Sequence, residues 1–226
     1  MAQEAGSLGD IETLESFVGG LIESVTLPAL SVSVVKGDRL VWSKGFGLAD
    51  LATASPASAR TSYLWFSMTK IVTATAVVRL AEDGKLDFDA PADEYFPGFK
   101  VVSQPTPVTV RHLLNHSSGL ANPLPIRSIR PADAPNPDHS TFVGRLLAKH
   151  RKLKSVPGER ASYSNLGYLV LGEIISEVTG ASYEEHVRRE ILSPLGMDHT
   201  GFSPGARRSR CCHRLPTPVA TSHPAI

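Results

Sequence analysis

Several features that would by themselves assign a protein to a class are scarce or missing in this chain. Its only two cysteines, Cys211 and Cys212, are adjacent and close to the end of the sequence, so they cannot cross-link the body of a fold. No apolar run approaches the roughly 20 residues that a membrane span needs. The first ten residues have neither a basic start nor an apolar stretch. We therefore expect a cytoplasmic protein without a disulfide framework and without a membrane span.

The net charge of the chain is also small. The formal net charge is +1, which supplies neither a basic field for nucleic acid nor an acidic field for a cationic partner. No G-x-S-x-G elbow and no phosphate-binding glycine loop is present, which argues against an α/β-hydrolase or a nucleotide enzyme. With 226 residues, 42% of them hydrophobic, the chain can bury a core as one domain, or as one domain with a lobe. We expect a small-molecule substrate and no cofactor, and the oligomeric state is open.

Hydrophobic periodicity predicts one helix, then a pair of strands, and then a series of further helices. Apolar residues recur at steps of three and four from Ile11 to Val25, which is typical of an amphipathic helix, and two alternating runs between residues 30 and 48 predict an antiparallel hairpin with one face buried under that helix. Residues 67–82 are apolar on most sides, so this helix is predicted to run through the middle of the protein. Further helices are predicted after the caps Thr109, Ser164 or Asn165, and Ser182, and at 140–149. The order favours the α+β class.

The pattern also suggests where the domain ends. We expect one domain over residues 1–204, in which 11–66 form the helix and hairpin and 67–204 form a mainly helical lobe. Residues 205–226 have no periodicity and are rich in Arg, Pro, Cys and His. This segment is predicted to be a disordered tail or the product of out-of-frame translation.

A serine and a lysine stand three residues apart at the predicted start of the apolar helix. Residues three apart share a helix face, so the amine of Lys70 can reach the hydroxyl of Ser67 and take its proton. Free backbone N–H groups at a helix start also favour a developing oxyanion. A lysine must be neutral to act as a base, and burial can lower its pKa from the reference value of about 10.4. The alternative is two polar residues that share one turn.

A tyrosine and an asparagine form a second candidate pair. Tyr163 and Asn165 follow a Pro-Gly turn and stand at the predicted start of another helix. A phenol can relay a proton, and an amide can bind a substrate carbonyl or orient the lysine. The alternative is a buried tyrosine beside a helix-capping asparagine.

Five segments in order resemble one family. "SMTK", "DGKLDFDAPADEYFP", "LLNHSSGL", "PGERASYSN" and "PLGMDHTGF" are similar to segments of the serine β-lactamase and penicillin-binding protein superfamily, in the branch of class C β-lactamases, D-alanyl-D-alanine carboxypeptidases and related esterases. The resemblance covers about residues 10–204 and implies an antiparallel sheet flanked by helices, with a helical lobe. It also implies that Ser67 is the acylated nucleophile, Lys70 its general base, Tyr163 the relay to the leaving group and Asn165 a substrate-binding residue.

The resemblance also implies a third element, Lys-Thr-Gly or a variant, on a strand that borders the site. The triplet His199-Thr200-Gly201 lies too close after the tyrosine to take that place, so we do not assign it. We expect a chain that is truncated at its C-terminus and lacks the last strands of the sheet. The expected activity is hydrolysis of an ester, a β-lactam or a D-alanyl peptide through an acyl-enzyme, with an ester favoured. The alternative is an inactive remnant or a binding module without turnover.

The remaining histidines, cysteines and acids do not predict a metal site. Cys211, Cys212 and His213 lack zinc spacing and a fourth ligand. We expect three other histidines to lie at the surface or to cap helices: His112, His116 and His139. The acidic run at Asp83, Asp87, Asp89 and Asp93 lacks the glycine and glutamate of a calcium loop, and is predicted to be a solvated connection.

Overall fold

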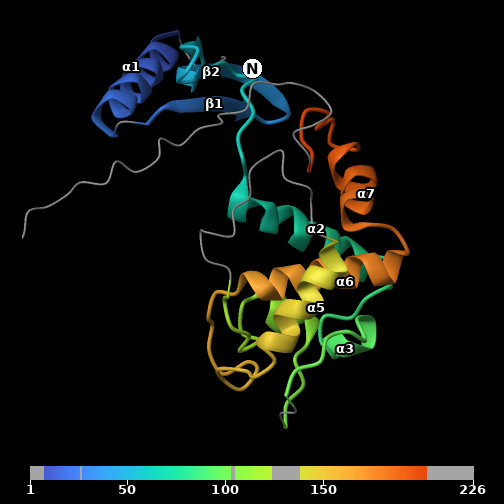
Figure 1. Cartoon of the computed structure of the whole chain (residues 1–226). Coiled ribbons are helices and arrows are strands. Elements are labelled where there is room, and N and C mark those ends of the chain that lie inside the picture. The colour runs from blue at the N-terminus through green and yellow to red at the C-terminus, as the bar shows by residue number, and fades with distance from the viewer. Residues whose placement is uncertain (1–7, 26, 103–104, 124–137, 203–226) are drawn as a thin grey trace, which may run out of the picture. The chain divides into compact units, whose positions relative to one another are not determined.

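The computed structural model describes residues 8–25, 27–102, 105–123 and 138–202 (Figure 1). The chain divides into two compact units, residues 1–64 with 204–226, and residues 65–203. We call the described part of the first the hairpin unit and that of the second the helical unit. The predicted tail at 205–226 lies outside the described residues.

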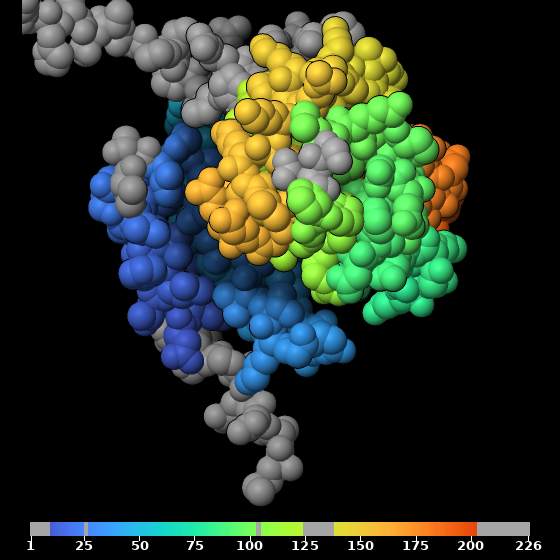
Figure 2. Space-filling view, turned by 90° about the horizontal axis from the view of Figure 1, so that it is seen from below, coloured from blue at the N-terminus to red at the C-terminus, as the bar shows by residue number. Residues whose placement is uncertain are grey.

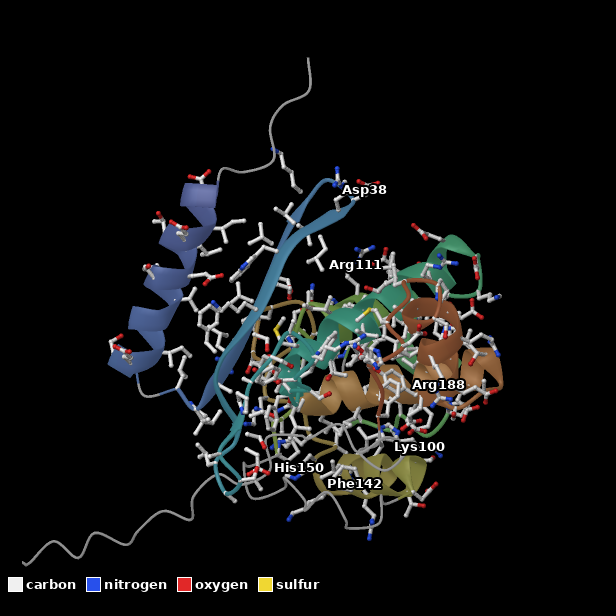
Figure 3. The ribbon with its side chains drawn as sticks, turned by 90° about the horizontal axis from the view of Figure 1, so that it is seen from above. Asp38, Lys100, Arg111, Phe142, His150 and Arg188 are labelled. Carbon is white, nitrogen blue, oxygen red and sulfur yellow. The ribbon has the colours of Figure 1, made fainter. Side chains whose placement is uncertain are left out.

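The hairpin unit consists of one helix and a small antiparallel sheet. Helix α1 spans Leu8–Val25, and strands β1 (Ala29–Lys36), β2 (Arg39–Asp50) and β3 (Ser55–Pro56) pair in the order β1-β2-β3. The tight turn after β1 uses Gly37, whose φ is +64°, and Figure 3 shows Asp38 at its tip. The hairpin prediction is therefore confirmed, with strands a residue or two longer than expected.

The hairpin unit buries few side chains. Glu15 of α1 accepts a hydrogen bond from Trp42 Nε1 at 3.0 Å and pairs with Lys44, so polar contacts join the helix to β2. Leu30, Val32 and Val34, on the face that we expected to be buried, are only half-buried.

The helical unit is a bundle built around one long helix. Helices α2 (Thr69–Glu82), α3 (Ala92–Tyr95), α4 (Val110–Leu114), α5 (His139–Lys149) and α7 (Tyr183–Val187) all contact α6 (Asn165–Thr179). A 3₁₀ turn, η1 (Phe66–Met68), precedes α2, and a π-helical turn, η3 (Arg188–Leu192), follows α7. Figure 2 shows the residues around 85–115, in green, beside residues 140–165, in yellow and orange, on one face of this unit. Its core includes fully buried side chains from most of these helices: Val77, Leu80, Leu113, Leu147, Leu166, Leu171 and Ile174.

The predicted caps explain where the helices begin and end. Thr109 and His112 form a reciprocal capping box at the start of α4, Ser164 Oγ accepts from the Gly167 N–H at the start of α6, and Gly180, with φ +66°, ends α6. Ser182 caps α7, but the helix that we expected to continue to Leu192 becomes π-helical from Arg188.

Helix α2 differs from its prediction in a way that bears on the site. We expected it to be buried on nearly all sides. One face is buried in the core through Thr73, Ala76 and Val77, whereas Ile71 is 59% exposed and Val78 is 41% exposed. Helix α2 therefore has apolar side chains on two faces, one in the core of the helical unit and one outside it.

No helix in the described ranges is both long enough and apolar enough to cross a bilayer.

Candidate active site

Ser67 stands at the turn that leads into α2. It lies in η1, and its neighbour Phe66 adopts a φ of +45°, a left-handed conformation that is unfavourable for a residue with a bulky side chain. Backbone strain of this kind persists only where the surrounding structure enforces it, and it is frequent at functional sites. The side chain of Ser67 is exposed, so a substrate can reach its hydroxyl.

Lys70 connects Ser67 to the start of α6. Its Nζ lies 3.5 Å from Ser67 Oγ and donates a 2.7 Å hydrogen bond to Asn165 Oδ1. The same ammonium group lies 4.9 Å from the ring centroid of Tyr163 and 5.4 Å from that of Tyr168, within the range of cation–π attraction. Two aromatic faces and one amide oxygen thus fix the position of the amine.

Tyr163 is the closest neighbour of the serine hydroxyl. Its phenol oxygen lies 2.7 Å from Ser67 Oγ, a hydrogen-bond distance that allows either group to donate. Burial by itself raises the pKa of Tyr163, but hydrogen bonding with Lys70 and Ser67 and the positive charge of Lys70 outweigh it, so the pKa lies below its ordinary value of 10.0. The phenol is therefore easier to deprotonate than a free tyrosine.

Asn165 is oriented by a residue that the sequence reasoning missed. Its backbone N–H and its Nδ2 both donate to Asn122 Oδ1, at 3.2 and 3.1 Å. Because Nδ2 is held in this way, Oδ1 faces Lys70. Asn122 stands just after the "NHSSGL" segment, and no spacing pattern links it to Asn165 across 43 residues of sequence.

His116 is the second residue that the sequence reasoning missed. We expected it at the surface or at a helix cap, but its ring lies 4.6 Å from that of Tyr163 and 5.1 Å from that of Tyr168. Its Nδ1 accepts a 3.3 Å hydrogen bond from the Ser164 backbone N–H, which requires the proton of the neutral ring to be on Nε2. Burial, followed by the charge of Lys70, lowers the pKa of His116.

Two loops hold this side of the site together. The backbone N–H of Ser162 donates to His116 O at 2.7 Å, that of Gly158 donates to Ser117 O at 2.9 Å, and that of Lys154 donates to Gly119 O at 2.8 Å. Gly119 has a φ of +74°, and a Cβ there would lie 2.3 Å from Ser155 O, so only glycine permits this approach. The pairing places Tyr163 against His116.

A hollow of about 610 Å³ lies beside the amine of Lys70. It is lined by the outward face of α2, including Ile71 and Val78, and by His116 and Tyr168. Most of the lining surface is apolar, although Arg79 and Glu82 of α2 also contribute to it.

The other histidines and acidic residues singled out in the sequence do not join this site. His112 caps α4, as predicted for this group of histidines. His139 instead pairs with the buried Glu173. Asp89 forms a bidentate ion pair with Arg111, with distances of 2.6 and 2.7 Å. His199 is exposed in a turn after η3. Among the described residues no group of His, Cys, Asp and Glu is arranged to hold a metal ion, and Cys211 to His213 lie outside them.

The fold and the site together define a class of protein: an α+β chain in which a serine just before α2 and a lysine in its first turn meet a tyrosine and an asparagine at the start of α6. The sequence model of the Beta-lactamase family matches residues 14–224. The chain therefore belongs to the β-lactamase family, which comprises serine hydrolases and penicillin-binding-like proteins, and the predicted fold class is confirmed.

Individual relatives agree with this assignment. Over 192 residues the chain is 31% identical to Protein flp of Staphylococcus aureus (strain MRSA252), covering 81% of this chain and 36% of flp. The octameric penicillin-binding protein homologue from Pyrococcus abyssi has 34% identity and a TM-score of 0.69, covering 84% of this chain and 44% of that protein. The D-amino acid amidase from Ochrobactrum anthropi SV3 has 27% identity and a TM-score of 0.66, covering 82% and 52% of the two chains. The chain spans about two fifths of the length of the first two relatives.

Proposed function

We propose that this chain carries the nucleophilic half of a serine hydrolase that acts through an acyl-enzyme on a small ester. The observation that supports this most directly is the continuous set of contacts from Tyr163 to Ser67, Lys70 and Asn165, at 2.7, 3.5 and 2.7 Å. If Ser67 were only a structural residue and Asn165 only a helix cap, no lysine would be needed between them.

In the proposed first step, Ser67 Oγ forms a bond to the substrate carbonyl carbon and its proton passes to the Tyr163–Lys70 pair. Lys70 is the general base in this proposal, and Tyr163 relays the proton to the leaving group as the bond to that group breaks. The product is an ester on Ser67. Water then attacks the ester carbonyl with the same relay, which releases the acid and restores the serine.

The oxyanion of this reaction needs hydrogen-bond donors. The backbone N–H of Ser67, at the start of α2, is the donor that we propose. Asn165, fixed by Asn122, is proposed to orient Lys70 and to bind the substrate.

The wall beside Lys70 suggests the substrate class. Its apolar side chains favour an acyl group with little charge, such as that of a short-chain ester. A D-configured amide is the other substrate class that we would test, because the D-amino acid amidase is among the similar structures.

The test uses the full purified chain with p-nitrophenyl butyrate, nitrocefin and a D-alanine anilide, together with a fluorophosphonate probe and a fluorescent penicillin. We expect ester turnover and labelling, and both should be lost in Ser67→Ala. Mass spectrometry should place the label on Ser67. Labelling that survives in Ser67→Ala would refute the assignment of the nucleophile.

Two lysine variants separate the possible roles of Lys70. Lys70→Ala should abolish labelling with the fold intact, as judged by circular dichroism. Lys70→Arg keeps a positive charge but cannot accept a proton at neutral pH, so it should also be unlabelled. Wild-type labelling of Lys70→Arg would mean that the lysine acts only through its charge on Tyr163.

The second candidate is a module that is acylated but does not turn over. It is favoured by the sequence, in which no triplet takes the place of the third motif expected from the resemblance. Labelling of Ser67 without release of product from any of the three substrates would support it.

A further inference from the structure

One histidine binds the backbone on both sides of Tyr163. The carbonyl oxygen of His116 accepts a hydrogen bond from the Ser162 N–H at 2.7 Å, and its Nδ1 accepts one from the Ser164 N–H at 3.3 Å. The ring of His116 also lies against that of Tyr163, with the two centroids 4.6 Å apart. The contacts that hold Tyr163 beside Ser67 therefore converge on a single residue.

The backbone of His116 is itself strained. Its φ is +62°, a left-handed conformation that is uncommon for residues other than glycine, although histidine and asparagine adopt it more often than most. Such strain persists only where the surrounding structure enforces it, and it is frequent at functional sites. Phe66, next to Ser67, is strained in the same way. Backbone strain thus occurs on both sides of the contact between Tyr163 and Ser67.

The hydrogen bond from Ser164 requires one protonation state of the ring. Because a backbone N–H needs an acceptor, Nδ1 of His116 must present its lone pair, and the proton of the neutral ring is on Nε2. A protonated imidazole has an N–H group on both nitrogens and cannot accept. Protonation of His116 would therefore break the hydrogen bond on one side of Tyr163 and set two donors against each other.

The groups that face the ring do not favour its protonated form. Tyr163 and Tyr168 lie against it, with centroids 4.6 and 5.1 Å away, and Lys70 of α2 lines the same hollow. In the described part of the chain no carboxylate is among the groups that shift its pKa. Burial, followed by the charge of Lys70, lowers that pKa from 6.5. The ring is therefore neutral at pH 7 and takes up its proton only below pH 6.5.

We propose that His116 is a positioning residue for Tyr163: the neutral ring holds the phenol at Ser67, and protonation of the ring displaces the phenol and slows acylation of the serine. This inference rests on the proposed function, because it takes Tyr163 as the relay at Ser67. No proton passes through His116 in the reaction. Its effect comes only from the position of Tyr163, and it gives acylation an acid limit that is separate from the ionisation of the phenol.

Two variants isolate the acceptor. Asparagine and glycine both tolerate a positive φ and both lack the ring, but only asparagine offers a side-chain oxygen to the Ser164 N–H. At about pH 8, His116→Asn should therefore react with the fluorophosphonate probe about tenfold faster than His116→Gly, the effect typical of one hydrogen bond. Circular dichroism checks that both variants are folded. Equal rates in the two folded variants would overturn the proposal.

The pH profile is a readout that a purely structural role would not change. Dividing the wild-type rate by the rate of His116→Asn cancels the groups that titrate alike in both chains, including Tyr163. We expect this ratio to be constant above pH 6.5 and to fall about tenfold per pH unit below the pKa of the His116 ring. A ratio that stays constant down to about pH 4.5 would overturn the proposal.

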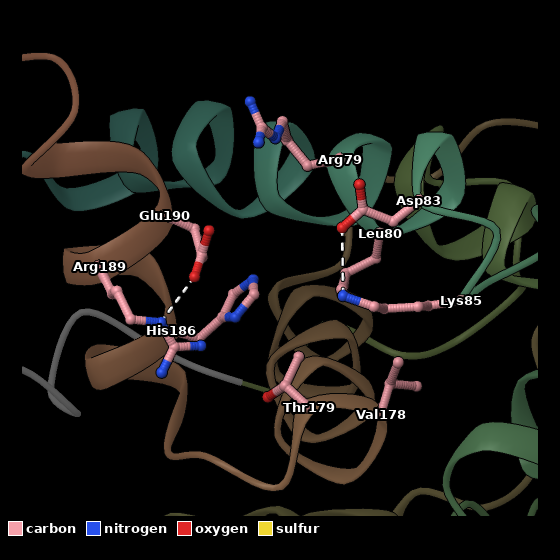
Figure 4. Close-up of a pocket in the computed structure, with 9 residues that line it drawn as sticks. All are labelled: Arg79, Leu80, Asp83, Lys85, Val178, Thr179, His186, Arg189 and Glu190. Carbon is pink, nitrogen blue, oxygen red and sulfur yellow. Dashed lines mark hydrogen bonds and ion pairs between the residues drawn. The ribbon is translucent and has the colours of Figure 1, made fainter.

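His186 provides the matched control. It is buried in α7, and burial lowers its pKa as well, so it also titrates below 6.5. Figure 4 shows its ring among the residues that line a pocket of about 170 Å³, to which none of the four candidate site residues contributes. Neither of its ring nitrogens has a hydrogen-bond partner among the described residues. His186→Asn should keep the wild-type pH profile, and loss of the acid limit in this variant would overturn the assignment to His116.

NMR of the full chain tests the inference without any reaction at Ser67. With ¹⁵N-labelled histidine, the proton of His116 should be on Nε2 at neutral pH, and the amide proton of Ser164 should move upfield with the same midpoint as the ring. A proton on Nδ1, or a Ser164 amide that does not follow the ring, would overturn the proposal. If Ser67 is never labelled, the proposed hydrolase fails, while these spectra still decide whether His116 controls the backbone at Tyr163.

Discussion

The hairpin unit and the helical unit differ sharply in what they bury. In the hairpin unit only Val18 and Ala49 are buried apolar residues, and strand residues such as Val35 and Leu40 are 62% and 64% exposed. The helical unit contains the rest of the buried apolar residues, and all of them except Ala121 belong to one cluster around α6. A short sheet with so little core is marginally stable alone, whereas a packed helical bundle fixes its side chains. Because the proposed site lies within the helical unit, its geometry depends on the better-packed region.

The largest effect that we expect distinguishes two tyrosines, one from each unit. Tyr163→Phe removes the phenol next to Ser67, so acylation by a fluorophosphonate should slow by about 10²- to 10⁴-fold. Tyr63→Phe removes a hydrogen bond of 2.9 Å to Ser31 in the hairpin unit and should cost only about 1 kcal/mol of stability. Acylation rates and thermal melting of both variants measure this. Equal slowing in the two would mean that Tyr163 has no special role.

The next effect compares two leucines by urea unfolding. Leu171 of α6 is fully buried, so Leu171→Ala should lower the free energy of unfolding by about 2–5 kcal/mol. Leu40 is 64% exposed, and Leu40→Ala should change it by no more than about 0.5 kcal/mol. A larger loss at Leu40 than at Leu171 would show that the hairpin unit is packed in solution against something that covers it.

The change of the acylation rate with pH should be smaller than the two effects described above. A lowered phenol pKa means that Tyr163 loses its proton at a lower pH than a free tyrosine, so the rate should rise with pH and the midpoint of the rise should lie below pH 10.0. Burial raises the pKa of Tyr168, which therefore serves as an internal reference that titrates above 10. This is checked by measuring acylation rates from pH 6 upward. NMR of ¹³C-labelled tyrosine follows the titration of both phenols in parallel. A midpoint above pH 10.0 would contradict the prediction.

The smallest effect concerns acid stability. The pKa of His116 is lowered from 6.5 in the folded chain, so the unfolded chain binds the proton more readily. The stabilisation is therefore complete above pH 6.5 and is lost as the pH falls through the folded-state value. His116→Gln cannot titrate, and its free energy of unfolding should fall less steeply below pH 6.5 than that of wild type. Parallel slopes would rule out a contribution from His116, and His186, unchanged in both chains, cancels in the comparison.

The sequence predicted elements whose signal is local. The caps at Thr109, Ser164 and Ser182 are short-range hydrogen-bond effects, and the structure contains all three. The spacing of Ser67 and Lys70 is equally local, because one helical turn brings them together. Tyr163 and Asn165 could be placed beside them only through the resemblance to a family.

The errors arose where distant segments meet. The wide apolar pattern of residues 67–82 led us to expect burial on nearly all sides, yet Ile71 and Val78 lie outside the core of the helical unit. Periodicity measures how apolar a helix is, but not how many neighbours cover it. His116 was missed for the same reason, because its partners Tyr163 and Tyr168 are more than forty residues away in the sequence.

The sequence by itself determined the family, the hairpin ahead of the helical lobe, and the four residues of the candidate site, since these depend on motifs and on hydrogen bonds between near neighbours. Tertiary structure alone decided that Tyr163 would lie closer than Lys70 to the hydroxyl of Ser67, that Asn122 and His116 would support the site, and that His186 would be buried without a partner. Such features depend on loops that pair across the fold, and packing, rather than local pattern, sets the distances between them.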